Sequence, residues 1–199
     1  MPVIHPGATL KPHFRDFLPA WVARQAWYCG TGVPWLRPVG FYRLEDSAGE
    51  VGIETHLVSD GLEVYQVPMT YRGAPLKAGD AGLIATAEHS VLGTRWIYDG
   101  PSDPIWAREV LRLIAENGSA ERSSRSGVGA VEAWGRQLAA TEMTAEPEVI
   151  EVRRVLTEGG LPEGPIVGLV MGSWQPDGPD GPSVTGCLAV ARPAAAGGP

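Results

Sequence analysis

The chain has 199 residues, of which 44% are hydrophobic and seven are tryptophan, enough for one domain of ordinary size or two small ones that share an interface. Its formal net charge of −7 argues against a nucleic-acid partner, because phosphate binding normally requires a surplus of Lys and Arg on one face. The stretch "MPVIHPGATLKPHF" has no basic start followed by an apolar run, and no apolar run elsewhere is long enough to span a membrane. We therefore expect a soluble cytoplasmic protein without a membrane partner.

The first element in chain order is a helix between Lys11 and Arg24, where apolar residues recur at three- and four-residue spacing. Pro19 lies inside this pattern, so the helix is expected to be kinked or split. From Pro38 the hydrophobic period changes to two. This alternation predicts an antiparallel meander of three strands joined by short turns, over residues 40–46, 50–60 and 62–73.

Two further strands, over residues 79–90 and 94–100, are expected to form a hairpin through the short connection "VLG". The stretch "SDPIWAREVLRLIAENG" then predicts a second helix. Ser102 or Asp103 can cap its start, Pro104 suits the first turn, and Gly118 ends it.

The pattern is weaker in the last third of the chain. The stretch "VEAWGRQLAATEM" is compatible with a strand or a short helix, because Gly135 interrupts either pattern. The loop "QPDGPDGP" is typical of a solvated hairpin connection. Strands are expected over residues 148–156, 165–174 and 185–193.

Common catalytic and metal-binding motifs are missing from the sequence. Both "GPSDP" and "GPSVT" lack the final glycine of a nucleophile elbow, and the two lysines, Lys11 and Lys77, have no phosphate-loop context. His and Cys residues do not occur at metal-ligand spacing, so no metal is predicted. Cys29 and Cys187 lie far apart, which favours a reducing compartment over a disulfide framework.

The stretch "AEHSVLGTRWIYDG" concentrates ionisable residues. Glu88 and His89 are neighbours on a strand and should point to opposite faces. One interpretation makes His89 a general base that Asp99 orients across the hairpin. The other, which we favour, pairs Arg95 or His89 with Asp99 to fix the "VLG" turn, with Trp96 in the core, because isolated polar pairs near hairpins are usually structural.

Four residues are candidates for ligand binding. Tyr71 and Arg72 offer a ring that stacks on sugars and a hydrogen-bonding fork, although the Gly and Pro that follow favour a simple strand end. Trp27 lies beside Tyr28 at the end of the first helix, in an aromatic platform or in the core. The fourth candidate is His89, a titratable side chain in the hairpin.

Four stretches together, "LPAWVARQAWYCG", "VYQVPMTYRGAPL", "LIATAEHSVLGTRWIYDGPSDPIW" and "VLRLI", resemble the N-terminal cap domain of actinobacterial maltokinases. They resemble still more the stand-alone proteins described as maltokinase N-terminal cap-like. The resemblance implies an α+β fold, a curved antiparallel β-sheet packed against helices, with a second small β-rich piece. The resemblance places a cap-like domain at 5–117 and a piece similar to a reduced kinase small lobe at 129–193. The small, polar composition between them predicts a linker (118–128), and the last residues predict a disordered tail (194–199).

In the full kinases the cap precedes a catalytic region that phosphorylates maltose with ATP and magnesium. This sequence departs from that pattern: it has no His-x-Asp, and Arg192 stands near the place of the ATP lysine. Arg is not equivalent to Lys at a phosphate site. No catalytic residue of the family can therefore be carried over.

The resemblance predicts a non-catalytic cap-like binding or regulatory module without a cofactor. Its protein partner would be a kinase-like chain or another enzyme of glucan or trehalose metabolism. Glu88, Arg95, Trp96, Tyr98 and Asp99 would form a structural signature that holds the cap together. The alternative is a subunit or truncated member of the sugar kinases that contributes part of an active site, with ATP and magnesium as cofactors. A third possibility is a sugar-binding protein that uses Tyr71, Trp27 and Trp96.

Overall fold

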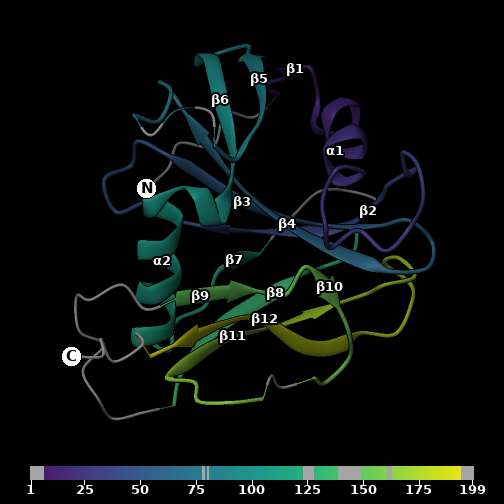
Figure 1. Ribbon diagram of the computed structural model, residues 1–199, viewed down its shortest axis with the longest axis vertical. Helices are drawn as coiled ribbons and strands as arrows, with labels where there is room; N and C mark the ends of the chain where they lie inside the picture. Colours follow the sequence, from purple (N-terminus) through teal and green to yellow (C-terminus); the bar gives the residue numbers. More distant parts are fainter. Residues whose placement is uncertain are drawn as a thin grey trace.

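The computed structural model describes residues 7–77, 79, 81–122, 128–138, 149–160 and 163–193. Helix α1 (Phe14–Val22) covers the upper face of the larger sheet in Figure 1, and helix α2 (Pro104–Ala115) and a smaller sheet lie against its lower face. A short 3-10 helix, η1 (Gly100–Ser102), precedes α2. The α+β fold that the sequence predicts is confirmed.

The larger sheet is antiparallel and curls into a half-barrel (Figure 1). Among the described residues its strand order is β1-β5-β6-β4-β3-β2-β7, and β10 also pairs with β4. The meander β2–β3–β4 and the hairpin β5–β6 confirm the strands predicted from residue 38 to residue 100. Their bounds are β1 Leu10–Lys11, β2 Arg37–Leu44, β3 Gly52–Ser59, β4 Val64–Arg72, β5 Leu83–His89, β6 Gly93–Asp99, β7 Glu121–Arg122 and β10 Val155–Leu156.

The smaller sheet has the order β8-β11-β12-β9 within the described ranges. The ambiguous stretch around Gly135 is a strand, although residues 139–148 lie outside the described part. The single strand expected over 148–156 is wrong: the chain passes there from one sheet to the other. The Arg153 N–H donates to Leu188 O, whereas the next carbonyl, Arg154 O, accepts from the Gln66 N–H. The strand bounds are β8 Glu132–Gln137, β9 Val149–Val152, β11 Gly168–Trp174 and β12 Val184–Arg192.

Helix α1 begins with a capping box and continues through Pro19. His13 is the N-cap, and the side chain of Asp16 accepts a hydrogen bond of 2.8 Å from the His13 N–H. Of the two expected outcomes at Pro19, the split is wrong because the helix is continuous, and the kink stays a prediction. Proline removes one backbone hydrogen bond, and the burial of Leu18 and Trp21 against the sheet holds the helix together on both sides of it.

Helix α2 begins where the sequence predicts. Of the two candidate caps, Asp103 takes the role, because its side chain accepts a hydrogen bond of 2.9 Å from the Ile105 N–H. The last turn lies directly on strand β8. A Cβ added to Gly135 would meet Leu113 O at 2.0 Å, so the helix reaches this distance only because residue 135 is glycine.

The main hydrophobic core lies between the lower face of the larger sheet, α2 and the smaller sheet. It joins residues from both predicted pieces, among them Leu57 and Ile114 from the first and Trp174 and Leu188 from the second. Gln66 adds a buried polar connection, since its Nε2 donates to Leu188 O at 2.8 Å. The two pieces therefore share one core.

The described part of the predicted linker is paired with its neighbours. Ser119 forms a bridge with Trp134, and β7 pairs with β2. Residues 123–127 and the tail 194–199 lie outside the described ranges. The boundaries at 117 and 129 stay predictions.

No helix in the described ranges is long and apolar enough to cross a membrane. Cys29 is exposed, Cys187 is buried, and neither is in a disulfide. Burial raises the pKa of the Cys187 thiol.

Candidate functional site

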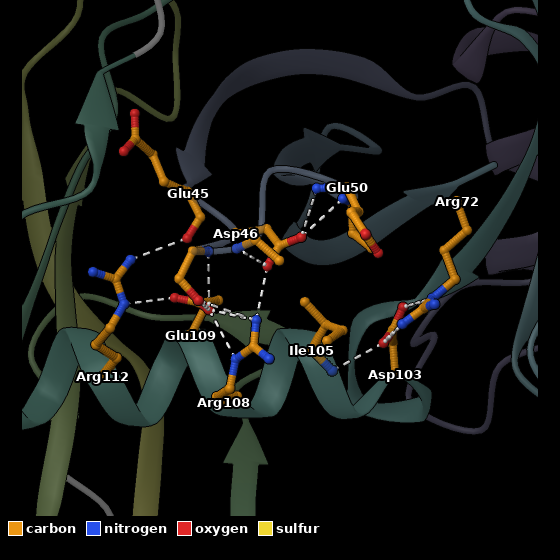
Figure 2. A network of polar contacts seen from close by, with 12 residues as sticks. Glu45, Asp46, Glu50, Arg72, Asp103, Ile105, Arg108, Glu109 and Arg112 are labelled. Atoms are coloured by element: carbon orange, nitrogen blue, oxygen red, sulfur yellow. Dashed lines mark hydrogen bonds and ion pairs between the residues drawn. The ribbon is translucent and has the colours of Figure 1, made fainter. Parts of the chain in front are cut away.

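A network of buried carboxylates fastens α2 to the turn between β2 and β3 (Figure 2). Glu109 accepts hydrogen bonds from Arg112 at 2.6 Å, Arg108 at 3.0 Å and the Ser47 hydroxyl at 3.2 Å. Burial disfavours ionisation of Glu109, but the hydrogen bonds from the two arginines outweigh it and lower the pKa. Burial also disfavours ionisation of Asp46, but the backbone N–H groups inside the turn donate to its carboxylate and lower its pKa.

Arg72, one of the four candidates for ligand binding, belongs to the same region (Figure 2). Its guanidinium binds Asp103 through two hydrogen bonds, of 2.6 Å from Nε and 2.8 Å from Nη2. Asp103 is fully buried and also caps α2. The hydrogen-bonding fork of Arg72 therefore joins β4 to α2.

The polar residues of the β5–β6 hairpin hold its turn. His89 Nδ1 accepts from the N–H groups of Val91 at 3.2 Å and Leu92 at 3.1 Å, and Arg95 donates to Leu92 O. Glu88 accepts a hydrogen bond of 2.6 Å from the Thr94 hydroxyl. Side chains fix the turn, as expected. They do so by binding backbone groups of the turn itself.

The predicted partnership of His89 or Arg95 with Asp99 is wrong. In the β5–β6 register His89 lies opposite Gly93, and Asp99 lies at the other end of the hairpin, where its N–H donates to Gly82 O. Asp99 binds Arg154 at 2.5 Å instead. Burial raises the pKa of Asp99 in spite of this arginine. No dyad of His89 and Asp99 exists.

Two other residues of the hairpin have different surroundings. Tyr98 is fully buried, and its hydroxyl accepts a hydrogen bond of 3.0 Å from the Leu76 N–H. Trp96 was expected in the core but is only half-buried, although it lies on the same face of β6 as the buried Tyr98.

Trp27 packs on the α1 side of the larger sheet. Its ring centroid lies 5.8 Å from those of Trp21 and Tyr65, and the guanidinium of Arg154 lies 5.3 Å from it. Tyr65 is at the start of β4 and Tyr71 near its end. The structure therefore places Trp27 and Tyr71 at different ends of the sheet.

Tyr71 and His89 both line a groove of about 920 Å³ on the α1 side of the larger sheet. The groove lies beside the first turn of α1. The Phe14 ring in the first turn lies 4.6 Å from the ring of His56, so α1 covers β3 at that residue. Towards the start of β3, Glu54 and Gly52 line the open groove.

Charged residues that the sequence analysis missed form the floor of this groove. Arg43 Nε donates to Glu54 Oε1 at 2.8 Å, and His56 Nε2 lies 3.1 Å from Glu54 Oε2. Burial opposes ionisation of Glu54, but the hydrogen bond and charge of His56, together with Arg43, lower its pKa to about 2. Strand alternation could have indicated this group, because residues 54 and 56 lie on the same face of β3. Their partners in β2, Arg43 and Phe41, lie on that face as well.

Neither a metal site nor a phosphate site is evident in the part of the chain that the structure describes. No three of its His, Cys, Asp and Glu residues lie close enough to hold a metal ion. Arg192, near the expected place of an ATP lysine, binds Glu151 at 2.9 Å and donates to the carbonyls of Glu163 and Pro165. Its donors are therefore used inside the fold.

Comparison with known families agrees with the resemblance seen in the sequence. Residues 21–103 match the family model of the maltokinase N-terminal cap domain. The match begins inside α1 and ends at the residue that caps α2, so it spans β2 to β6. A search of the curated proteins found no match to the chain.

Proposed function

We propose that this chain is a non-catalytic cap-like module, of the stand-alone actinobacterial kind, that binds a kinase-like protein partner in the cytoplasm. The match of residues 21–103 to the maltokinase cap supports this class. The hairpin residues Glu88, His89 and Asp99, which first suggested catalysis, are engaged in contacts that maintain the fold. The proposed module needs no cofactor of its own.

One observation carries the proposal of a protein partner. Val33, Trp35 and Leu62 are 67%, 78% and 90% exposed, although the chain has a well-packed core elsewhere. Trp35 precedes β2, whose first residue, Arg37, pairs with Ser59 at the end of β3. The loop with Val33 and Trp35 and the turn with Leu62 therefore lie at the same end of the sheet, which we call the apolar end.

Exposed aromatic side chains are frequent binding hot spots, because their burial removes a large apolar surface from water. Trp35 and Val33 also lie inside the matched cap region. The partner that this supports is a kinase-like chain without its own cap, which offers an apolar surface to the apolar end. Enzymes of glucan or trehalose metabolism are the other class of partner to test.

The test is calorimetric titration of the full chain with kinase-like proteins from its own host. We expect Trp35→Ser to weaken binding at least tenfold and Leu62→Ser to weaken it less. Val91→Ser is the matched control, because Val91 is 58% exposed in the turn at the other end of the sheet. All three variants should melt at the wild-type temperature, since exposed side chains contribute little to folding.

Equal affinity of Trp35→Ser and the wild type would contradict the proposal. So would ATP-dependent phosphorylation of maltose by the purified chain alone. If phosphorylation appears only in the complex and is lost on substitution of a residue of this chain, the module supplies part of an active site, and the non-catalytic proposal fails.

A further inference from the structure

The groove on the α1 side of the larger sheet has an aromatic ring on one strand and hydrogen-bonding groups on the next two. Tyr71 in β4 lies opposite Gly52 in β3, and a Cβ built on Gly52 would lie 3.5 to 3.9 Å from the Cβ, Cγ and Cδ2 atoms of Tyr71. The tyrosine side chain therefore lies at van der Waals distance beside the open space above Gly52. This exposes an aromatic surface to the groove.

Beside this ring, the Arg43–Glu54 pair supplies fixed donors and acceptors. The low pKa of Glu54 keeps it ionised at neutral pH. Its two oxygens accept two hydrogen bonds from Arg43 and contact His56, and a carboxylate has about four lone-pair positions, so about one remains for a ligand. Glu54 and Arg43 are about one-fifth and three-tenths exposed, which leaves both within reach of the groove.

The charges that line the groove nearly balance. Lys11, Arg43 and Arg95 face Asp16, Glu50, Glu54 and Glu121. Such a lining does not favour an anion or a cation, but it offers many donors and acceptors to hydroxyl groups. A volume of about 920 Å³ is within the range of about 300–1,000 Å³ typical of small-molecule sites.

We propose that this groove is a binding site for a neutral carbohydrate of a few sugar rings. One ring stacks on Tyr71, and its hydroxyls donate to Glu54 and accept from Arg43. The groove and the apolar end lie at opposite ends of the same strands: β3 runs from Gly52 in the groove to Ser59 beside the apolar end. The carbohydrate site is therefore independent of the proposed protein partner.

The test uses the full chain and three neutral trisaccharides of different linkage, maltotriose, cellotriose and N-acetylated chitotriose, with glycerol as a control for weak polyol binding. Binding is measured by calorimetry and by NMR saturation transfer. We expect at least one trisaccharide to bind with a Kd of 1 mM or lower, and glycerol not to saturate.

Substitutions locate the site. Tyr71→Ala should weaken binding at least tenfold, whereas Tyr71→Phe, which keeps the ring, should remain within threefold. Glu54→Gln should weaken binding about tenfold, and the melting curve of each variant checks that it is folded. Val149→Ser, at an exposed position in β9 of the smaller sheet, is the control and should bind the sugar like the wild type.

Two results would overturn the inference: no binding of any trisaccharide at 10 mM, or equal affinities of Tyr71→Ala and the wild type. If binding is abolished by Trp35→Ser rather than by Tyr71→Ala, the sugar binds at the apolar end and the groove proposal fails. None of these results bears on the kinase-like partner, which is tested separately.

Discussion

Three carboxylates, of which Asp103 and Glu109 are buried and Asp99 is partly buried, bind arginines at points where elements of the fold meet. Asp99 at the end of β6 binds Arg154 near β10, Asp103 at the start of α2 binds Arg72 in β4, and Glu109 binds two arginines of α2 beside the β2–β3 turn. Removing one partner of such a pair leaves the other charge buried without compensation. Substitution of one of these carboxylates should therefore lower the free energy of unfolding more than substitution of an exposed residue does.

Asp99→Ala tests this at a single residue. The substitution leaves Arg154 largely buried without its carboxylate, and we expect a loss of about 3 kcal/mol in the free energy of unfolding. For a chain of 199 residues, the melting temperature should fall by roughly 6–12 °C. Glu88→Ala is the control, since its exposed hydrogen bond to Thr94 contributes less than about 0.5 kcal/mol. An unchanged melting curve for Asp99→Ala would contradict the structural role.

The partners of these residues could not be found from the sequence. Strand alternation correctly separates Glu88 from His89, but the register of the hairpin decides what lies opposite Asp99, and Arg154 is 55 residues away. The residues of the groove could not all be found from the sequence either. Tyr71 and His89 were candidates, yet Glu54 and Arg43 meet only when β2 and β3 pair.

At the scale of elements, the start of α2 depends on one residue with two functions. Asp103 accepts from the Ile105 N–H and also binds Arg72. We expect Asp103→Ala to lose about 3–5 kcal/mol, because it removes the cap and leaves Arg72 unpaired. Asp103→Ser keeps a capping oxygen but cannot hold the arginine, so it should recover about 1 kcal/mol of this loss in denaturant unfolding. Equal losses in both variants would show that the cap contributes nothing.

Elements with strong local signals were predictable. Alternation indicated β2 to β6, and the Asp103–Pro104 start indicated α2, because these patterns lie within the element itself. The two-residue strands β1 and β7 carry no such pattern and exist only through their partners. The change of sheet between β9 and β10 is likewise fixed by contacts with Leu188 and Gln66, far away in sequence.

At the scale of the whole molecule, the two sheets bury each other. The lower face of the larger sheet exposes Leu57 and its neighbours if residues 129–193 are removed. We therefore expect a chain cut after residue 122 to aggregate or to lack a cooperative unfolding transition, whereas the full chain unfolds in one step. A stable, monomeric fragment with a sharp transition would show that the cap-like piece folds alone.

The stability of the whole molecule should depend on pH through the carboxylates whose pKa values folding shifts. Glu54 has a pKa of about 2 in the folded chain, below its ordinary value of 4.5. A lowered pKa stabilises the fold fully above the ordinary value, and this contribution is lost as the pH falls towards 2. The shift corresponds to about 3 kcal/mol, of which about 2 kcal/mol should be lost between pH 7 and pH 3.

Asp46, Asp103 and Glu109 have lowered pKa values and add to this loss, whereas the raised pKa of Asp99 acts in the opposite direction. Urea unfolding at several pH values measures the summed effect of these carboxylates on the free energy of unfolding. In Glu54→Gln the slope between pH 5 and pH 2 should be smaller than in the wild type. An identical slope would mean that Glu54 is not ionised preferentially in the folded state.

The contact between α2 and the smaller sheet has a consequence for finding related proteins. A Cβ on Gly135 would meet Leu113 O at 2.0 Å, and one on Gly168 would meet the Ile114 side chain at 2.2 Å. A chain that packs its helix in this way must therefore carry glycine at both places. Both lie outside the matched stretch 21–103. This pair gives a search criterion that separates proteins with the second sheet from those that share the cap region alone.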